Sequence, residues 1–505
     1  MGTTRRTPPQ HAGTEADTAT GTAAPRTVAA GTPPPGTAAQ AAQVLGGRED
    51  GGRRREQARE AMARLARAEV HGTALTWVDN AGLTRVKAVP AGRLDRAVAS
   101  GVGMSPCFDA YLVDDSMADS PHVGGPDGDL RLVPDLEKLT VLAAQPGWAW
   151  APVDRCEQDG TPYASCQRGF ARRMTERARD EHGIELRMGF ETEWVVTRGP
   201  QPGAAGEPAY PTTGPAYGMA RLVETADYLR DVLTALTTQG VEVLQIHPEY
   251  APGQFEVSVA PSDPVGAADL AVLVRETVRA VSLRHGLTAS FGPVVDPAGV
   301  GSGCHLHLSL WREGRNLCAG GAGPFGMTEE CELFLAGVLR ELPALLALGA
   351  PSPASYLRLR PSRWAGAYHC WGLENREAAL RFVAGTAHAP GGANAEVKCV
   401  DAAANPYLLA GGVVAAGLAG PAGDGALRLP DPVTGDPART APDQAPPRLP
   451  GSLAEALRHF ENSAVLRTAM GEPLFEAVRA VRAGEIALFD GVSDAELAAA
   501  TRGRY

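Results

Sequence analysis

Several motifs of well-known binding sites are missing from this chain of 505 residues. Its eight cysteines form no C-x-x-C pair and no spacing typical of zinc, so reduced thiols are the simplest interpretation. There is no G-x-x-x-x-G-K-[ST] loop and no kinase-type H-R-D or D-F-G set, which leaves the common nucleotide-binding folds unsupported. The net charge of −11 argues against nucleic acid as the main partner.

Export and membrane signals are missing as well. No apolar segment near the N-terminus resembles a signal peptide. The longest uncharged run, residues 402–423, contains Pro406 and several glycines. This run therefore predicts a buried, closely packed helix rather than a membrane span. We expect a cytoplasmic protein with no membrane partner.

Composition divides the chain into three parts. Residues 1–55 are rich in Pro, Thr, Ala and Gly, with no aromatic residue before Trp77, and are predicted to be a disordered tail. Residues 56–160 are predicted to form a small, mostly β domain, because short apolar segments alternate there with Gly, Asp and Pro. A basic helix over 54–70 is expected to precede the short apolar segments of this domain. In residues 161–505, helical patterns alternate with paired strands, which predicts an α+β domain.

Helix signals in the large domain are clear at several places. Apolar spacing predicts helices over 169–183, 220–240 and 264–286, each followed by a strand-like segment. A loop rich in Pro, Gly and Asp spans 420–450. The sequence SLAE at 452–455 predicts a capping box at the start of the last helical region.

Two glutamates stand out in the apolar segment MGFETEWVV, residues 188–196. On a strand, Glu191 and Glu193 project from the same face because side chains at i and i+2 share a face. Two like charges side by side in a buried strand are costly unless something positive lies between them. The alternative is a solvated edge strand, and this segment alone leaves both interpretations open.

Further ionisable residues occupy other strand-like segments of the large domain. They are Glu249, Glu256, His305, His307 and Glu396. Each one alone is more typical of a structural role. Together with the Glu191 pair they form a set of oxygen and nitrogen ligands without thiols, which suits Mg²⁺ or Mn²⁺ rather than zinc. Two metal ions would explain why so many carboxylates tolerate one another.

A cluster of arginines lies between Tyr356 and Phe382. It comprises Arg358, Arg360, Arg363, Arg376 and Arg381. Such a cluster is usually a solvated face, but here the arginines alternate with Trp, Tyr, Phe and Leu, so that some of them must point inward. Inward arginines pair with carboxylate or phosphate. Together with the metal-binding carboxylates, they suggest that the site handles a nucleoside triphosphate through Mg²⁺.

From about residue 70 onward the chain resembles the glutamine synthetase family. The similar blocks, in the order of the family, are GFETEW, HPEYAPGQFEV, GSGCHLHLSLW, YLRLRP…WGLENREAALRF and NAEVKCVDAAANPYL. The resemblance implies a small β-grasp N-terminal domain and a large catalytic domain with a curved antiparallel sheet. It also implies a homododecamer of two stacked hexameric rings, with active sites between neighbouring subunits.

The resemblance implies a role for each of the unusual polar residues. One divalent metal would be bound by Glu193, Glu249 and Glu256, and a second, against the ATP phosphates, by Glu191, His305 and Glu396. ATP and two or three Mg²⁺ or Mn²⁺ ions are the implied cofactors.

The remaining implied roles concern substrates and phosphate. Arg358 would bind the carboxylate of glutamate, Arg376 and Arg381 would stabilise the transferring phosphoryl group and the nucleotide, and His307 would lie at the phosphate end. Gly301 belongs to the glycine loop that approaches the amino-acid substrate.

The sequence departs from the family pattern mainly where ammonia would bind. The family has a carboxylate on a flap at the position of Trp364 and another, from the neighbouring N-terminal domain, near Ser105, with Asp109 as an alternative. An aromatic wall suits an alkyl chain or an organic cation.

Three further departures lie close to the acid-substrate and nucleotide sites. Asn394, expected at the nucleotide, and Lys398, expected at the substrate, replace arginines, and Val300 replaces an asparagine.

We therefore expect an ATP-dependent ligase that joins glutamate to an amine larger than ammonia, such as ethanolamine or a polyamine, through a γ-glutamyl phosphate. One alternative is a glutamine synthetase that uses ammonia. Another is a catalytically weak family member that senses nitrogen metabolites. A two-metal hydrolase would fit the carboxylates but not the arginines that face phosphate.

Overall fold

The structure, a computed structural model, describes residues 48–126, 128–199, 208–421, 427–441 and 443–505. Residues 1–47 of the predicted disordered tail lie outside the described residues. Residues 48–55, also predicted to be part of this tail, instead belong to helix α2 (Arg48–Arg67). This helix begins earlier than the predicted 54–70, and Ala58 and Leu65 anchor it in a buried core.

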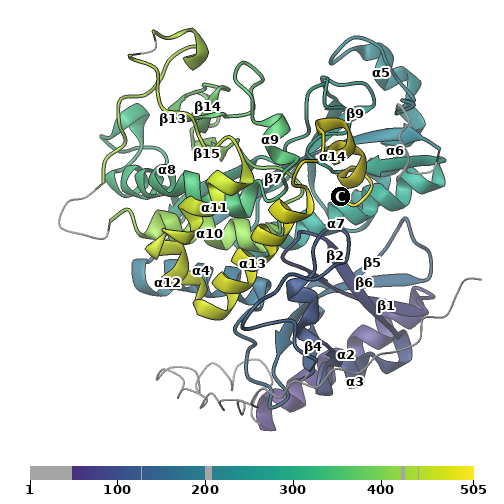
Figure 1. Cartoon of the computed structure of the whole chain (residues 1–505). Helices are drawn as coiled ribbons and strands as arrows, with labels where there is room; N and C mark the ends of the chain where they lie inside the picture. The colour runs from purple at the N-terminus through teal and green to yellow at the C-terminus, as the bar shows by residue number, and fades with distance from the viewer. Residues whose placement is uncertain (1–47, 127, 200–207, 422–426, 442) are drawn as a thin grey trace, which may run out of the picture.

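The N-terminal domain is built on a six-stranded sheet with the order β2-β1-β6-β4-β3, to which β5 adds beside β6 (Figure 1). Its strands are β1 (Gly72–Val78), β2 (Thr84–Pro90), β3 (Val102–Met104), β4 (Leu130–Pro134), β5 (Thr140–Val141) and β6 (Trp148–Cys156). Helices α2 and α3 (Leu94–Ser100) contribute to the same hydrophobic core as the sheet, around Leu75 and Leu132. The prediction of a small, mostly β domain is correct.

The large domain contains a nine-stranded sheet with the order β13-β14-β15-β11-β7-β9-β8, in which β10 also pairs with β7 and β12 with β11. Its strands are β7 (Glu185–Arg198), β8 (Val243–Pro248), β9 (Gln254–Val259), β10 (Leu287–Ser290), β11 (Leu306–Arg312), β12 (Arg315–Asn316), β13 (Tyr368–Leu373), β14 (Ala378–Val383) and β15 (Asn394–Val397). All pairs are antiparallel except β13 with β14. The predicted α+β class is confirmed, with this one parallel pair as a departure.

Strand β7, which carries the two unusual glutamates, lies inside the sheet between β11 and β9. Glu191 pairs with Ser258, and Glu193 pairs with Glu256 on β9. The edge-strand interpretation is therefore wrong, and the two carboxylates must be accommodated in the interior of the sheet.

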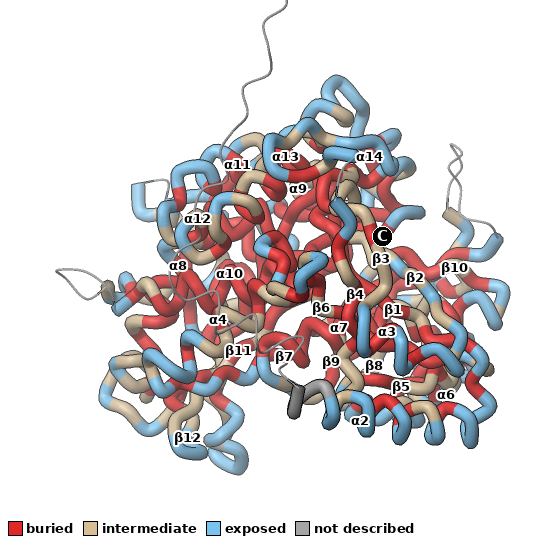
Figure 2. The backbone as a smooth tube through the Cα atoms, turned by 90° about the horizontal axis from the view of Figure 1, so that it is seen from below, coloured by how far each residue is buried: buried red, intermediate tan, exposed pale blue. Residues whose placement is uncertain are grey.

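Helices contribute most of the residues of the large hydrophobic core, and Figure 2 shows the buried stretches of the chain in red. The helices of this domain are α4 (Gln167–His182), α5 (Met219–Glu224), α6 (Ala226–Thr238), α7 (Pro264–Arg284), α8 (Glu329–Gly349), α9 (Ser355–Arg358), α10 (Pro406–Leu418), α11 (Leu453–Glu461), α12 (Ala464–Met470), α13 (Glu472–Leu488) and α14 (Asp494–Thr501). Every residue of α10 is buried, as predicted for the uncharged run. Its glycines permit this packing, because a Cβ at Gly417 would collide with the Phe334 ring. No helix among the described residues is long and apolar enough to cross a bilayer.

Two local predictions need correction. The helix expected over 220–240 is two helices, α5 and α6, because Thr225 adopts a non-helical backbone with φ of −120°. The capping box expected at 452–455 is incomplete. Ser452 accepts the N–H of Glu455, but the Glu455 carboxylate accepts the N–H of Gly451 instead of that of Ser452.

One buried arginine connects the two domains. Arg168, at the start of α4, is 4% exposed. Its guanidinium contacts Asp135 at 2.7 Å and Asp154 at 3.0 Å in the N-terminal domain. It also contacts Asp269 of α7 at 2.8 Å. Because several carboxylates depend on one cation, the domains are joined by charge as well as by apolar packing.

We expect Arg168→Met to lower the free energy of unfolding by about 3–5 kcal/mol, because it leaves the buried carboxylate of Asp269 and the partly buried carboxylates of Asp135 and Asp154 without their shared partner. The matched control is Arg177→Met, which removes the exposed pair with Glu181 at 2.8 Å and should cost less than about 1 kcal/mol. Urea unfolding followed by circular dichroism measures both. Equal effects of the two substitutions would contradict a connecting role for Arg168.

Candidate active site

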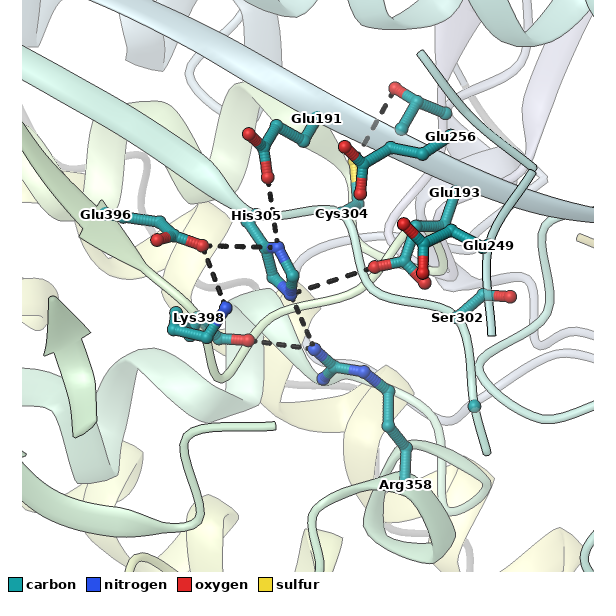
Figure 3. A network of polar contacts seen from close by, with 12 residues as sticks. Glu191, Glu193, Glu249, Glu256, Ser302, Cys304, His305, Arg358, Glu396 and Lys398 are labelled. Atoms are coloured by element: carbon teal, nitrogen blue, oxygen red, sulfur yellow. Dashed lines mark hydrogen bonds and ion pairs between the residues drawn. The ribbon is translucent and has the colours of Figure 1, made fainter. Parts of the chain in front are cut away.

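A cavity of about 570 Å³ is lined by charged side chains of the large sheet and its loops. Its residues come from β7, β8, β9, β14 and α9 and from the loops between strands, and Figure 3 shows the network around His305. The size is within the range of cavities that bind small substrates and cofactors.

The first cluster of possible metal ligands consists of Glu191, His305 and Glu396. They come from β7, from the residue before β11, and from β15, which are neighbours in the sheet. The Nδ1 atom of His305 lies 3.3 Å from an oxygen of Glu191 and 3.3 Å from an oxygen of Glu396. These are the three residues expected to share one metal.

The second cluster consists of His247, Glu249 and Glu256. The two ring nitrogens of His247 each lie 3.3 Å from a carboxylate oxygen, one from Glu249 and the other from Glu256. Sequence analysis missed His247, although its position two residues before Glu249 could have indicated it.

Glu193, expected to share a metal with Glu249 and Glu256, lies between the two clusters. Its Oε1 is 3.9 Å from Nε2 of His305, and its Oε2 accepts a 2.8 Å hydrogen bond from Gln254. Burial, together with the charges of Glu256 and Glu249, raises the pKa of Glu193 to about 8. The side chains around it therefore do not neutralise this carboxylate.

The pKa values of the other acids and of His247 shift in different directions, according to how far neighbouring charges and hydrogen bonds offset burial. Burial raises the pKa of Glu249. In contrast, the hydrogen bond to His305 and the nearby imidazole of His307 outweigh burial and lower the pKa of Glu191. The hydrogen bond to Glu256 raises the pKa of His247 to about 9.

The two clusters fit divalent cations of the Mg²⁺ or Mn²⁺ type. Their ligand atoms are carboxylate oxygens and imidazole nitrogens, the hard and intermediate donors that such ions accept. Cys304 lies nearby, but its thiol contacts the Thr192 hydroxyl at 3.9 Å and belongs to neither cluster. A cation would also relieve the repulsion that raises the pKa of Glu193.

Arg358 of α9 is buried at the floor of the cavity. Its Nη2 donates to the carbonyl of Lys398 at 2.8 Å and lies 3.3 Å from Nε2 of His305. Its Nη1 is buried and has no hydrogen-bond partner among the described residues. A buried guanidinium nitrogen without an acceptor is suited to an incoming carboxylate.

The other predicted arginines differ in how strongly they are held. Arg381 is shared by two carboxylates, with Nη1 3.0 Å from Glu396 and Nη2 2.6 Å from Glu374. Arg360, Arg363 and Arg376 are exposed side chains on the cavity lining. The arginine cluster is thus neither entirely inward nor entirely a solvated face.

Lys398, His307 and Asn394 lie around the first cluster of possible metal ligands, and Lys398 also lines the cavity. The Lys398 ammonium lies 2.9 Å from Glu396. Nε2 of His307 is 3.1 Å from Glu191, and its Nδ1 is 2.8 Å from Asn394. Their contacts orient and neutralise the first cluster, and the predicted substrate and nucleotide roles of Lys398 and Asn394 remain predictions.

Glycines allow the loop before β11 to approach the cavity closely. A Cβ at Gly301 would lie 2.8 Å from the Arg358 side chain, and one at Gly303 would lie 2.6 Å from Nε2 of His305 and 3.0 Å from Glu193. Gly301 was predicted at the substrate, and Gly303 was missed. Val300 also lines the cavity.

Three aromatic side chains on the cavity lining are largely exposed. Trp364, expected at the amine site, is 58% exposed, and Tyr217 and Tyr250, which sequence analysis missed, are 55% and 60% exposed. The Tyr217 hydroxyl donates to Glu249 at 2.8 Å. An aromatic edge therefore adjoins the second carboxylate cluster.

The two N-terminal candidates do not line this cavity within one chain. The Ser105 hydroxyl accepts the N–H of Cys107 at 3.2 Å. Asp109 is completely buried, and both of its oxygens lie 2.8 Å from Nη1 of Arg155. Asp109 is therefore part of the domain core, and the suggestion that it could replace Ser105 at the amine site is wrong.

Comparison with known proteins gives a consistent picture. A family model described as "Glutamine synthetase, catalytic domain" matches residues 164–499, and one for the "Glutamine synthetase N-terminal domain" matches residues 59–163. A gamma-glutamylpolyamine synthetase of Streptomyces coelicolor is 55% identical over 455 residues, covering 89% of this chain and 97% of that protein. Glutamine synthetase of Pyrococcus abyssi is 30% identical, covering 79% of this chain and 86% of that protein. The crystal structure of a novel glutamine synthase homologue superposes with a TM-score of 0.76 at 33% identity, covering 86% of this chain and 99% of that one.

We expect Mg²⁺ to raise the melting temperature, and to do so more strongly at pH 9 than at pH 7. The pKa values of about 8 for Glu193 and about 9 for His247 mean that both groups hold protons at pH 7 that a metal must displace. Differential scanning fluorimetry with and without Mg²⁺ measures the shift, and His247→Gln should weaken its pH dependence. A shift that is larger at pH 7 would contradict this assignment of the ligands.

Proposed function

Because the chain belongs to the glutamine synthetase family, it is an ATP-dependent ligase that forms γ-glutamyl amides, and we propose that its amine substrate is a polyamine. The observation that carries the proposal is the exposed indole of Trp364 on the cavity lining, at the position where the family has a flap carboxylate. The 55% identity to a gamma-glutamylpolyamine synthetase supports the same choice.

On the acid side, we assign glutamate to Arg358. The unpartnered Nη1 of its buried guanidinium would donate to the α-carboxylate, and the Lys398 carbonyl and His305 fix the orientation of the side chain. Gly301 leaves room for the substrate backbone because any side chain there would collide with Arg358. Binding the α-carboxylate at a fixed point positions the γ-carboxylate for reaction.

The γ-carboxylate oxygen attacks the γ-phosphorus of ATP, ADP leaves, and a γ-glutamyl phosphate forms. Divalent cations, when bound at the two clusters, would neutralise phosphate charge. Arg376, an exposed cation on the lining, is assigned to the migrating phosphoryl group. Arg381 holds Glu396 in the first cluster and adds positive charge at the same end.

On the amine side, the neutral nitrogen of the polyamine attacks the acyl carbon and phosphate leaves. The leaving phosphate accepts the proton that the nitrogen loses when the neutral amide forms. A polyamine carries further ammonium groups on an alkyl chain. Trp364, Tyr217 and Tyr250 offer apolar contact to the chain and π-faces to the cations. Ammonia would gain little from these contacts.

We also propose a homododecamer of two stacked hexameric rings, located in the cytoplasm. The exposed apolar side chains of Met219 and Val223 on α5 and Leu244 on β8 support an interface beside the cavity. Ser105, which does not line the cavity of its own chain, would then reach the amine site of a neighbour. All eight cysteines are free, in keeping with a reducing compartment.

The first test is phosphate release from ATP with Mg²⁺ and glutamate, across ammonia, ethanolamine, putrescine, spermidine and spermine. We expect release with the polyamines and little with ammonia. Trp364→Ala should raise the KM for the polyamine by about tenfold, since a cation–π and apolar contact contributes on the order of 1 kcal/mol or more. The KM for ATP should not change.

Three results would contradict the polyamine assignment. They are release with ammonia alone, release with ethanolamine but no polyamine, and a Trp364→Ala variant with an unchanged polyamine KM. Trp364→Glu provides the complementary variant, because a carboxylate there should favour ammonia relative to the polyamine.

The assembly can be tested separately. Val223→Asp places a charge in the proposed apolar interface, and we expect it to reduce the sedimentation coefficient of the purified protein by breaking the ring. Arg230→Asp, on the exposed face of α6, is the control and should leave the assembly intact. A wild-type protein that sediments as a monomer would contradict the dodecamer.

A further inference from the structure

The loop that carries Trp364 has an unusual backbone. It connects α9 to β13, residues 359–367, and is called here the α9–β13 loop. Three alternate residues in it have positive φ values: 55° at Ser362, 55° at Trp364 and 70° at Gly366. For the two residues other than glycine this conformation is strained, so the surrounding structure must hold it in place.

Residues outside the α9–β13 loop hold its strained part in place. The N–H of Trp364 donates to Oε1 of Glu377 at 2.7 Å, and the Ser362 hydroxyl donates to Asp436 at 2.9 Å. Gly366 packs against β14, where a Cβ would lie 3.0 Å from Cα of Ala379. The hydrogen bond from Trp364 therefore fixes the residue whose indole reaches the cavity lining.

Glu377 is itself fixed in place. It lies just before β14 and is 4% exposed. Its N–H donates to Oδ1 of Asn375 at 3.0 Å, and the amide of Asn375 donates to the carbonyls of Val433 and Gly435. Glu377 thus contacts the α9–β13 loop through its side chain and, through its backbone N–H and Asn375, is tied to the segment at Val433 and Gly435.

Burial of the charged Glu377 carboxylate costs free energy at this position. Its Oε2 is buried and accepts no hydrogen bond from the described residues. Burial raises its pKa, and the nearby Lys398 ammonium is already paired with Glu396. An apolar side chain would fill this space without the cost of burying a charge, but it would leave the N–H of Trp364 without this acceptor.

We propose that Glu377 is a positioning residue for the amine substrate, acting through the backbone of Trp364 to present the indole to the cavity. It is one residue from Arg376 in sequence, yet its side chain is directed at the loop and does not line the cavity. It therefore determines affinity for the amine without touching the amine. This inference rests on the proposed function, because it takes Trp364 as part of the amine site.

The experiment compares wild type with Glu377→Ala, Glu377→Gln and the control Asp159→Ala. Asp159 also accepts a backbone N–H, from Thr161 at 2.9 Å, but lies in the N-terminal domain away from the cavity. With spermidine as the amine, Glu377→Ala should raise the amine KM about tenfold, the loss expected for one buried hydrogen bond, with smaller effects on kcat and on the KM for ATP. Glu377→Gln keeps an acceptor oxygen and should restore the wild-type KM, and Asp159→Ala should leave it unchanged.

A double-mutant cycle tests whether Glu377 acts through Trp364. In a Trp364→Ala background, Glu377→Ala should raise the amine KM no further. Additive effects of the two substitutions, or an equal rise in the KM for ATP and for the amine, would overturn the proposal. If the alanine variant does not fold, Glu377→Asp withdraws the carboxylate by one methylene, and an unchanged amine KM in that variant would also overturn it.

Hydrogen exchange separates this inference from the proposed function. Without any substrate, peptides covering residues 359–367 should exchange faster in Glu377→Ala than in wild type. Faster exchange with an unchanged amine KM, or unchanged exchange, would overturn the positioning role. A wild-type enzyme that uses only ammonia would instead refute the polyamine assignment, and the exchange result would still report on the loop.

Discussion

Negative charge inside the large sheet is the constraint on which the rest of the site depends. Glu193 and Glu256 are direct neighbours on adjacent strands, and Glu249 lies close to both. Like charges in this arrangement repel, so the fold must supply positive charge around them. It does so unequally. Glu396 contacts the ammonium of Lys398 and the guanidinium of Arg381. The charges of Lys398, His305 and His307 outweigh burial and lower the pKa of Glu396. Glu193 accepts a hydrogen bond from the neutral amide of Gln254 and stays poorly compensated. The protein therefore neutralises Glu396 of the first cluster with its own cations and leaves Glu193, which lies between the two clusters, dependent on an external cation.

Much of this arrangement could be predicted from the sequence, because the pattern is local. The i, i+2 spacing of Glu191 and Glu193 gives a shared face on any strand. Alternation of arginines with large apolar residues shows that some must point inward. The helices at 169–183 and 264–286 were predicted to within two residues at each end, since their apolar spacing and end signals lie within the segments themselves. The alternation of helical patterns with paired strand-like segments was sufficient to predict the α+β class.

The errors have a common cause in contacts between distant residues. Nothing local distinguishes Asp109, whose partner Arg155 is 46 residues away, from an exposed acid near the amine site. The contact of His247 with Glu256 depends on the register of β8 and β9, which spacing along one strand does not determine. The backbone of the α9–β13 loop was equally invisible, since Ser362 and Trp364 are not residues that signal positive φ. Sequence analysis thus identified the residues of the candidate site more reliably than the contacts among them.

The contacts of Arg168 bear on how far the two domains are exchangeable between relatives. The two family models meet between residues 163 and 164, which suggests two separable domains. Yet this arginine, on the catalytic side of that boundary, is held by Asp135 and Asp154 from the other side and by Asp269, which also accepts a hydrogen bond from Tyr407. A chimera made by joining the halves of two relatives would inherit a mismatched set of charges unless these positions were transferred together. The parts on either side of this boundary are therefore coupled through charge, so that a substitution at Asp135 or Asp154 changes the surroundings of Arg168 across it.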